Sequence, residues 1–288
     1  MGKVIEILKL TRIEHSAMLV FAVIAAEFLA GGLPQLPVLV LSLITPVFIS
    51  MGSFAINDYF DIEVDRKNGK IHRPLVRGTI SPIGALFVAD AAMTIGIGAS
   101  IPLGANALLI ALVFAILSIA YSWKLKEILL LGNVYIAFTM VIPFIYGSYV
   151  VSQYVGNAAM LVSVMVFFSG LAREIHGTIR DYKGDRERGV ASLPQKIGVR
   201  NAAAVAAALY LIAILMSAYL FIYTPPFMLN PAYGIIIAVS DFMLAYAACA
   251  YMKEKHTAKE HSRLRNVSLL GMGIAILAIL VSAALPHI

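Results

Sequence analysis

The stretch LPVLVLSLITPVFISMGSFAINDYFDIEVD, residues 36–65, decides the fold class of this protein. From Leu36 to Ile56 it contains no charged residue. A helix of about 20 apolar residues crosses the hydrocarbon core of a bilayer. The stretch then ends on three aspartates, Asp58, Asp61 and Asp65. It therefore predicts a membrane-spanning helix that carries a polar motif at one end.

The rest of the chain is equally apolar. Hydrophobic residues make up 60% of the 288 and charged residues 13%, with a mean hydropathy of +0.87, whereas soluble domains carry about 25% charged residues. We expect an all-α integral membrane protein, a single polytopic domain over residues 1–288. Nine segments are apolar and long enough to span, namely 16–34, 36–57, 82–103, 105–121, 128–151, 157–176, 201–223, 229–252 and 267–286.

The basic residues alternate between connections. All 22 lysines and arginines fall before the first span, in 58–81, in 122–127, in 173–200 or in 253–265. The connections near 35, 104, 154 and 226 have none, and neither does the C-terminus. Because basic connections stay in the cytoplasm, we predict a cytoplasmic N-terminus in the plasma membrane, with the net charge of +6 reflecting topology. The lone Cys249 excludes an intrachain disulfide.

A second charged cluster, REIHGTIRDYKGDRERG at 173–189, follows the sixth predicted span as the first cluster follows the second. The two lie four spans apart. This weak internal repeat suggests two pseudo-equivalent helix bundles, about 16–151 and 157–286, that face each other across one site.

The spacing of the acids predicts a metal site. On a helix, Asp58, Asp61 and Asp65 stand at i, i+3 and i+7, and Asn57 lies one turn before Asp61, so all four share one face. Asp181 and Asp185 repeat the device at i, i+4. Aligned carboxylates repel, and Mg²⁺, which prefers oxygen ligands, neutralises them while keeping positions open for phosphate oxygens. We predict two Mg²⁺ ions.

Bases interleave with these acids, which favours a metal–diphosphate site over a simple cation site. Because the site adjoins an apolar protein interior, the implied substrate has a diphosphate head and a long hydrocarbon tail. The alternative is that the basic residues only follow the topology rule and contact lipid phosphates. The cations nearest the acids are Arg66, Lys67, Lys70, Arg73, Arg77, Lys124, Lys126, Arg180 and Lys183.

The motifs NDYFDIEVD, HRPLVRG, YSWKLK (121–126), DYKGD and GVASLPQKIG resemble those of the UbiA superfamily of intramembrane prenyltransferases. The resemblance implies nine helices around a central cavity, two Mg²⁺ ions and transfer of a prenyl group from a prenyl diphosphate. It assigns Asn57, Asp58, Asp61 and Asp65 to the first metal and Asp181 and Asp185 to the second. It places Arg73, Lys126 and Tyr121 around the diphosphate.

Within the superfamily, the stretch that starts at Arg173 is most similar to archaeal digeranylgeranylglyceryl phosphate synthases. It departs from their pattern at Gly177, Thr178 and Lys183, where they carry further acids. The expected reaction is transfer from geranylgeranyl diphosphate to geranylgeranylglyceryl phosphate in ether-lipid synthesis. The alternatives are an aromatic acceptor such as 4-hydroxybenzoate, a CDP-alcohol phosphotransferase, whose Asp-Gly and Ala-Arg pairs are missing here, and a cation transporter.

We expect the membrane lipids, the prenyl diphosphate and the acceptor as partners, with no nucleic acid and no obligate protein partner.

The candidate residues fall into three sets. Glu27, Asp90 and Asp241 lie within predicted spans, and their roles stay open. The predicted catalytic residues are Asp61, Asp65, Asp181, Asp185, Tyr121 and Lys126. The predicted substrate-binding residues are Asn57, Lys70, Arg73, Arg77, Tyr121, Lys126, Asn133 and Arg180.

The charge pattern yields a topology prediction. Tags inserted at residue 154 and at the C-terminus should report the outside of the cell, and a tag near residue 70 should report the cytoplasm. The reason is that, of these three regions, only the one around residue 70 carries basic residues. Protease protection or cysteine labelling measures this. Residues 70 and 154 on the same side would exclude nine spans.

Overall fold

The computed structural model describes residues 2–187, 191–253 and 257–285, without the side chains of Glu14, Ala258 and residues 183–187. Every regular element in these ranges is helical. Eight helices are long and apolar enough to cross a membrane, which makes this a multi-pass membrane protein. They are α3 (Leu36–Phe60), α6 (Pro82–Ser100, extended by η2, Ile101–Leu103), α7 (Ala105–Trp123), α8 (Leu131–Ser152), α9 (Asn157–Glu187), α11 (Val199–Tyr223), α12 (Pro231–Tyr251) and α13 (Ala258–Ala284).

The first predicted span, 16–34, is the element that differs. It forms α2 (Ser16–Leu29), a helix of 14 residues, shorter than the roughly 20 residues that span a bilayer. Gly31 and Gly32 follow with φ of 134° and 124°, so the backbone leaves the helix there. Eight long spans are thus found within the described residues, and a ninth stays a prediction.

Two helices extend well beyond their predicted spans. The helix α9 has 31 residues and continues through the second acidic motif. The helix α13 starts at Ala258, since Thr257 and Glu260 form a reciprocal capping box. The remaining elements are short: α1 (Gly2–Leu10), η1 (Ile13–His15), α4 (Ile62–Lys67), α5 (Pro74–Arg77), η3 (Leu125–Glu127) and α10 (Leu193–Ile197).

The chain divides into two compact units. Unit 1 comprises Met1–Val23 and Leu33–Leu125, and unit 2 comprises Ile24–Gly32 and Lys126–Ile288. The pseudo-repeat of two bundles, about 16–151 and 157–286, stays a prediction.

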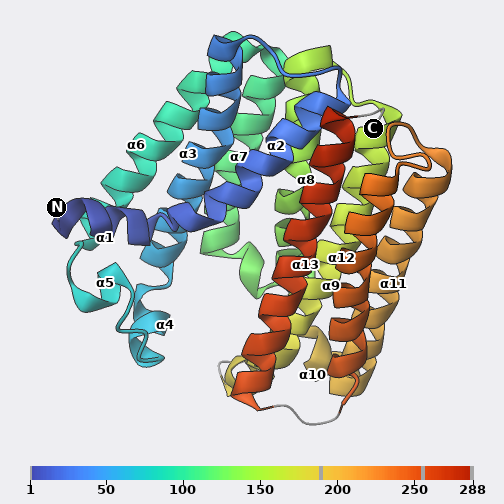
Figure 1. The fold of residues 1–288 in the computed structure, drawn as a ribbon. Coiled ribbons are helices and arrows are strands. Elements are labelled where there is room, and N and C mark those ends of the chain that lie inside the picture. The colour runs from blue at the N-terminus through green and yellow to red at the C-terminus, as the bar shows by residue number, and fades with distance from the viewer. Residues whose placement is uncertain (1, 188–190, 254–256, 286–288) are drawn as a thin grey trace. The chain divides into compact units, whose positions relative to one another are not determined.

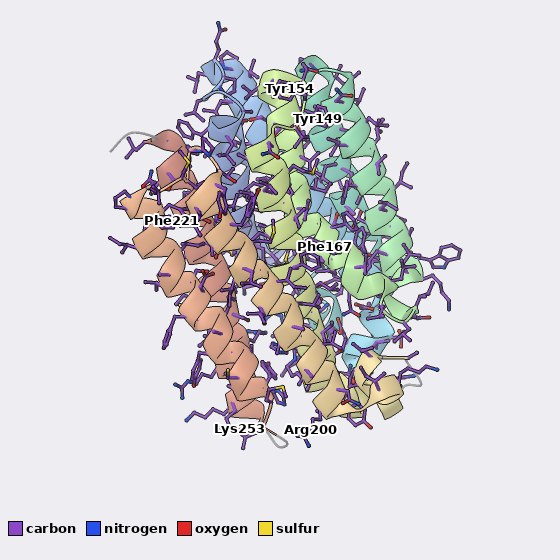
Figure 2. All side chains as sticks on the ribbon, turned by 90° about the vertical axis from the view of Figure 1, so that its right-hand side faces the viewer. Tyr149, Tyr154, Phe167, Arg200, Phe221 and Lys253 are labelled. Atoms are coloured by element: carbon purple, nitrogen blue, oxygen red, sulfur yellow. The ribbon has the colours of Figure 1, made fainter. Side chains whose placement is uncertain are left out.

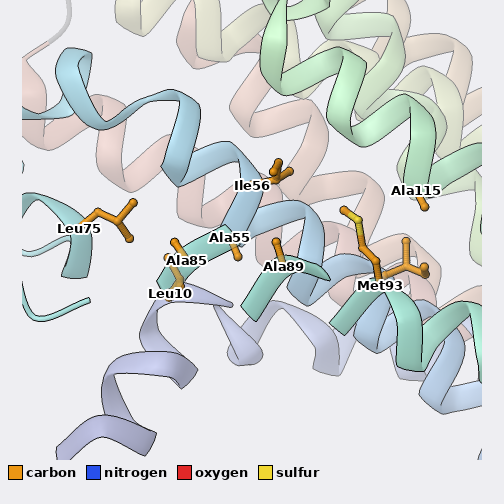
Figure 3. Packing of buried hydrophobic residues seen from close by; sticks show 9 residues of the cluster. Leu10, Ala55, Ile56, Leu75, Ala85, Ala89, Met93 and Ala115 are labelled. Carbon is orange, nitrogen blue, oxygen red and sulfur yellow. The ribbon is translucent and has the colours of Figure 1, made fainter. Parts of the chain in front are cut away.

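In unit 1, α3 packs along α6 and also contacts α7 (Figure 1). Small side chains allow the close approach of α3 and α6, as is common where membrane helices associate. Ala55, Ala85 and Ala89 belong to the buried cluster, which Leu10 of α1 and Leu75 of α5 join (Figure 3). The N-terminal helix and the charged connection therefore share the core of the spanning helices.

In unit 2, α9 packs against α8, α11 and α13, and α12 packs against α11 and α13 (Figure 1). Figure 2 shows Arg200 and Lys253 at one end of this unit and Tyr149 and Tyr154 at the other. Within unit 2, these basic connections therefore lie at the end opposite the uncharged connection near residue 154, as the sequence predicts.

Two glycines of α6 test the packing of unit 1. A Cβ at Gly96 would lie 2.9 Å from the carbonyl oxygen of Thr45 and 3.0 Å from the backbone nitrogen of Ile49, whereas a Cβ at Gly98 meets nothing within 4 Å. We expect Gly96→Ala to destabilise the protein by about 1–3 kcal/mol through overpacking. The matched change Gly98→Ala should be neutral or stabilising by up to about 1 kcal/mol. Thermal unfolding in detergent measures both, and equal effects would contradict the packing.

Candidate active site

The first acidic motif lies where α3 ends and α4 begins. Asp61 is the junction residue, yet its N–H donates to the carbonyl of Asn57 (3.0 Å) and its own carbonyl accepts from the N–H of Asp65 (2.8 Å). The helical register thus continues through the junction. The Asn57 amide also donates to Asp61 Oδ2 at 3.1 Å. The structure therefore keeps Asn57, Asp61 and Asp65 at the spacing that the sequence predicted.

Two of the aspartates are buried and bonded to cations. Asp58 is 3% exposed and Asp65 2% exposed. Arg73 Nη1 bridges them, at 2.5 Å from Asp58 Oδ1 and 2.7 Å from Asp65 Oδ2. Lys70 Nζ lies 2.9 Å from Asp65 Oδ1, and Arg12 Nη2 lies 2.7 Å from Asp58 Oδ1. Buried carboxylates need such partners, because an uncompensated charge removed from water is strongly destabilising.

Arg12 also belongs to this cluster, although its place in the sequence predicts only a topology charge. It has a left-handed backbone, with φ 48° and ψ 51°, just before η1. Its guanidinium carbon lies 4.7 Å from the centre of the Phe54 ring, a cation–π contact. The sequence separation of 46 residues between Arg12 and Asp58 hides this pair from any local pattern.

Glu6 bonds α1 to the charged connection between α3 and α6. Its carboxylate accepts hydrogen bonds from the Thr79 hydroxyl (2.7 Å), from Lys9 (3.0 Å) and from Arg77. These bonds lower the pKa of Glu6 from 4.5 to about 2. Arg77, which the sequence assigned to substrate, is therefore paired with Glu6 rather than with the aspartates.

The second acidic motif lies on α9 beside a cavity of about 290 Å³ within unit 2. Arg180 donates two bonds to Asp181, at 2.8 and 2.6 Å, and Arg173 donates to Glu174 at 3.1 Å. The side chain of Asp185 lies outside the described part of the chain, as does that of Lys183. The charged and amide residues of the cavity wall are Asn133, Arg173, Glu174, Arg180, Asp181 and Arg265.

The structure thus joins some predicted residues and leaves others apart. It brings Asp58, Asp65, Lys70 and Arg73 into one cluster, and it lines one cavity with Asn133, Arg180 and Asp181. Among the side chains that it describes, no three acids or histidines converge closely enough to hold a metal. Tyr121, near the end of α7, and Lys126, in η3, are both partly exposed.

The three acids inside predicted spans have different surroundings. Asp241 on α12 accepts a 2.6 Å hydrogen bond from the Ser217 hydroxyl on α11, so it bonds two helices of unit 2. Glu27 on α2 is fully buried, and Asp90 on α6 is exposed. The role of Asp241 is therefore a structural one, in helix packing.

Comparison with known proteins agrees with this architecture. Residues 18–283 match the model of the UbiA prenyltransferase family. A digeranylgeranylglyceryl phosphate synthase of Archaeoglobus fulgidus is 35% identical over 275 residues, 95% of this chain and 94% of that protein. One of Korarchaeum cryptofilum is 32% identical over 81% of this chain and 84% of its own. The protein is therefore a membrane-embedded enzyme, and it belongs to the UbiA prenyltransferase family.

Solved structures show the same fold. A structure of a digeranylgeranylglyceryl phosphate synthase superposes with a TM-score of 0.79, at 27% identity over 98% of this chain and 99% of that one. A UbiA homologue of Archaeoglobus fulgidus, bound to GPP and Mg²⁺, has a TM-score of 0.66 at 21% identity, covering 95% of this chain and 99% of its own.

The lowered pKa of Glu6 generates a pH prediction. Glu6→Gln should lower the midpoint of thermal unfolding at pH 7, because the ionised carboxylate stabilises the fold wherever the pH exceeds its unfolded pKa of 4.5. The difference should shrink as the pH falls from about 4.5 toward 2, where the wild-type carboxylate protonates too. Glu63→Gln is the matched control, since its ion pair with Arg66 is exposed and contributes little. A Glu6 difference that stayed constant with pH would contradict the assignment.

Proposed function

We propose that this enzyme transfers a prenyl group from a polyprenyl diphosphate, geranylgeranyl diphosphate by preference, to geranylgeranylglyceryl phosphate in ether-lipid synthesis. One observation carries the chemistry: Asn57, Asp61 and Asp65 keep one helical register, while Arg73 and Lys70 both form ion pairs with Asp65. Hard oxygen ligands next to phosphate-binding cations suit a metal–diphosphate complex. The likeness to digeranylgeranylglyceryl phosphate synthases over nearly the whole chain supports the acceptor.

The donor set suits Mg²⁺, because it offers carboxylate and amide oxygens and no soft ligand. We assign Asn57, Asp58, Asp61 and Asp65 to one ion and Asp181 and Asp185 to a second. The UbiA homologue of Archaeoglobus fulgidus that is bound to GPP and Mg²⁺ supports magnesium as the metal. When bound, Mg²⁺ supplies stabilisation of the diphosphate leaving group as negative charge develops on it.

In this proposal, Arg73 and Lys70 bind the aspartates in the absence of substrate and the diphosphate in its presence. In the structure, Arg73 and Lys70 neutralise Asp58 and Asp65. With a metal ion held by the aspartates, the same cations would present their N–H groups to diphosphate oxygens, where the charge of the leaving group grows. Arg12 keeps Asp58 in place from the side of α1. Tyr121, Lys126, Asn133 and Arg180 complete the proposed substrate contacts.

The reaction itself breaks the allylic C–O bond of the prenyl diphosphate and forms a new bond from the acceptor hydroxyl oxygen to that carbon. The hydroxyl proton leaves to a carboxylate or to the released diphosphate. An apolar enclosure excludes water, which would otherwise capture the cationic carbon. We place the site at the cytoplasmic face of the plasma membrane, in a bundle of nine spans around a central cavity, following the distribution of basic residues.

The test is a reconstituted transfer assay. Purified protein receives Mg²⁺ and geranylgeranyl diphosphate, with either geranylgeranylglyceryl phosphate or 4-hydroxybenzoate as acceptor. We expect the doubly alkylated lipid and no aromatic product. Asp61→Asn should reduce turnover at least about a hundredfold, because losing a metal ligand costs more than losing a group that only supports one. EDTA should stop the reaction.

Lys259→Ala is the control, because this exposed residue at the start of α13 belongs to the topology charges. It should retain full turnover and the same unfolding temperature. Prenylation of 4-hydroxybenzoate alone would replace the acceptor and leave the diphosphate chemistry standing. Unchanged turnover in EDTA or in Asp61→Asn would refute the metal site, and a folded protein without any product would refute the proposed function.

A further inference from the structure

The face of α9 that borders the cavity in unit 2 carries two parallel rows of side chains. Arg173, Gly177 and Arg180 stand at i, i+4 and i+7, and Glu174, Thr178 and Asp181 repeat this spacing one residue later. Residues at these spacings lie above one another on a helix. A basic row thus runs beside an acidic row, and both line the cavity.

The basic row has donors without acceptors. Arg173 uses Nη1 on Glu174 at 3.1 Å, but its Nε is buried and has no hydrogen-bond partner within the described residues. A buried N–H without an acceptor is costly, and native structures rarely leave one unexplained. Arg173 also lies within a membrane span, where charged residues usually mark a functional site.

A third guanidinium reaches the same cavity from α13. Arg265 forms no ion pair with the part of the chain that the structure describes, and its hydrogen bond to Asn266 is long, at 3.4 Å. The charged lining therefore comprises three arginines against Glu174 and Asp181, an excess of one positive charge. This excess favours an anion.

Two hydroxyl groups of the cavity wall already donate their protons to backbone carbonyls. Thr178 donates to the carbonyl of Ile175 at 2.8 Å and Ser268 to that of Arg265 at 3.0 Å, so both offer only lone pairs to the cavity. Gly177 adds room, because a Cβ there would meet nothing within 4 Å. The charged donors that line the cavity are therefore the guanidiniums, which match phosphate geometry with two parallel bonds.

We infer that this cavity binds the phosphate group of the acceptor lipid, through Arg173, Arg180 and Arg265. The inference rests on the proposed function, and it assigns the acceptor phosphate to a part of the site that is separate from the residues proposed for the diphosphate. A volume of about 290 Å³ suits a small head group, since pockets for whole ligands begin at about 300 Å³. Arg173 lies eight residues from Asp181, about 12 Å along the helix. In the acceptor, the glycerol holds the phosphate within a few ångströms of the reacting hydroxyl. A phosphate bound between Arg173 and Asp181 therefore keeps that hydroxyl near the row that contains Glu174 and Asp181.

The test uses Arg265→Ala, because Arg265 is exposed and its loss is compatible with folding. Wild-type protein without prenyl diphosphate should be stabilised against thermal unfolding more by geranylgeranylglyceryl phosphate than by geranylgeranylglycerol, which lacks the phosphate. Arg265→Ala should lose that difference. In the transfer assay it should raise the KM for the phosphorylated acceptor about tenfold or more, as expected for a lost charge-assisted bond, and leave the KM for geranylgeranyl diphosphate unchanged.

Arg263→Ala is the matched control, two residues earlier on α13, where the guanidinium lies over the Tyr246 ring at 6.0 Å and does not line the cavity. It should behave as wild type. Arg265→Lys should recover only part of the affinity, since lysine lacks the planar fork. A raised KM for the prenyl diphosphate alone would assign the cavity to the diphosphate and overturn the inference.

Two further outcomes separate this inference from the proposed function. Equal stabilisation of the wild-type protein by both acceptor lipids would overturn the phosphate site even if transfer proceeds. Phosphate-dependent stabilisation that requires Arg265, in a protein that transfers nothing, would support the phosphate site while the proposed function fails.

Discussion

Burial of charge at the end of a membrane helix is the constraint on which unit 1 depends. Asp58 and Asp65 are almost fully buried, and Arg73 bridges them. Neither acid is stable there without its cation, so the connection that carries Arg73 and Lys70 must fold back onto the end of α3. The same demand brings in Arg12 and, through Glu6 and Leu10, the whole N-terminal helix. One ionic cluster thereby determines the course of three short helices.

Much of this was readable in the sequence, because hydropathy and helical spacing are local properties. Eight of the nine predicted spans appear as long apolar helices within the described residues, six of them close to their predicted bounds, and the register of Asn57, Asp61 and Asp65 survives the junction at Asp61. The first span is the exception, since hydropathy alone does not register that Gly31 and Gly32 end the helix at 14 residues. Family membership also followed from local motifs.

Contacts between distant residues could not be predicted in this way. The sequence gives no sign that Arg12 binds Asp58 or that Arg77 binds Glu6, because each pair depends on how separate helices pack. It likewise counted Arg265 as a topology charge, although this residue borders the cavity beside Asp181. The positive-inside rule treats all basic residues alike, so it does not identify those that also line a site. Only their positions in the folded structure distinguish them.

The hydrogen bond that Thr79 donates to Glu6 has a consequence for biogenesis. It joins residues 73 positions apart, and a ribosome exposes its chain from the N-terminus onward. The first helix therefore emerges long before its partners, with its apolar residues still uncovered. Val4, Ile5 and Leu8 stay exposed even in the folded protein, so the lipid surface is the apolar surface that suits this helix both before and after its partners arrive. The charged cluster is therefore completed only after α3 and the connection that follows it have been synthesised, and until then the N-terminal helix is held by the lipid surface.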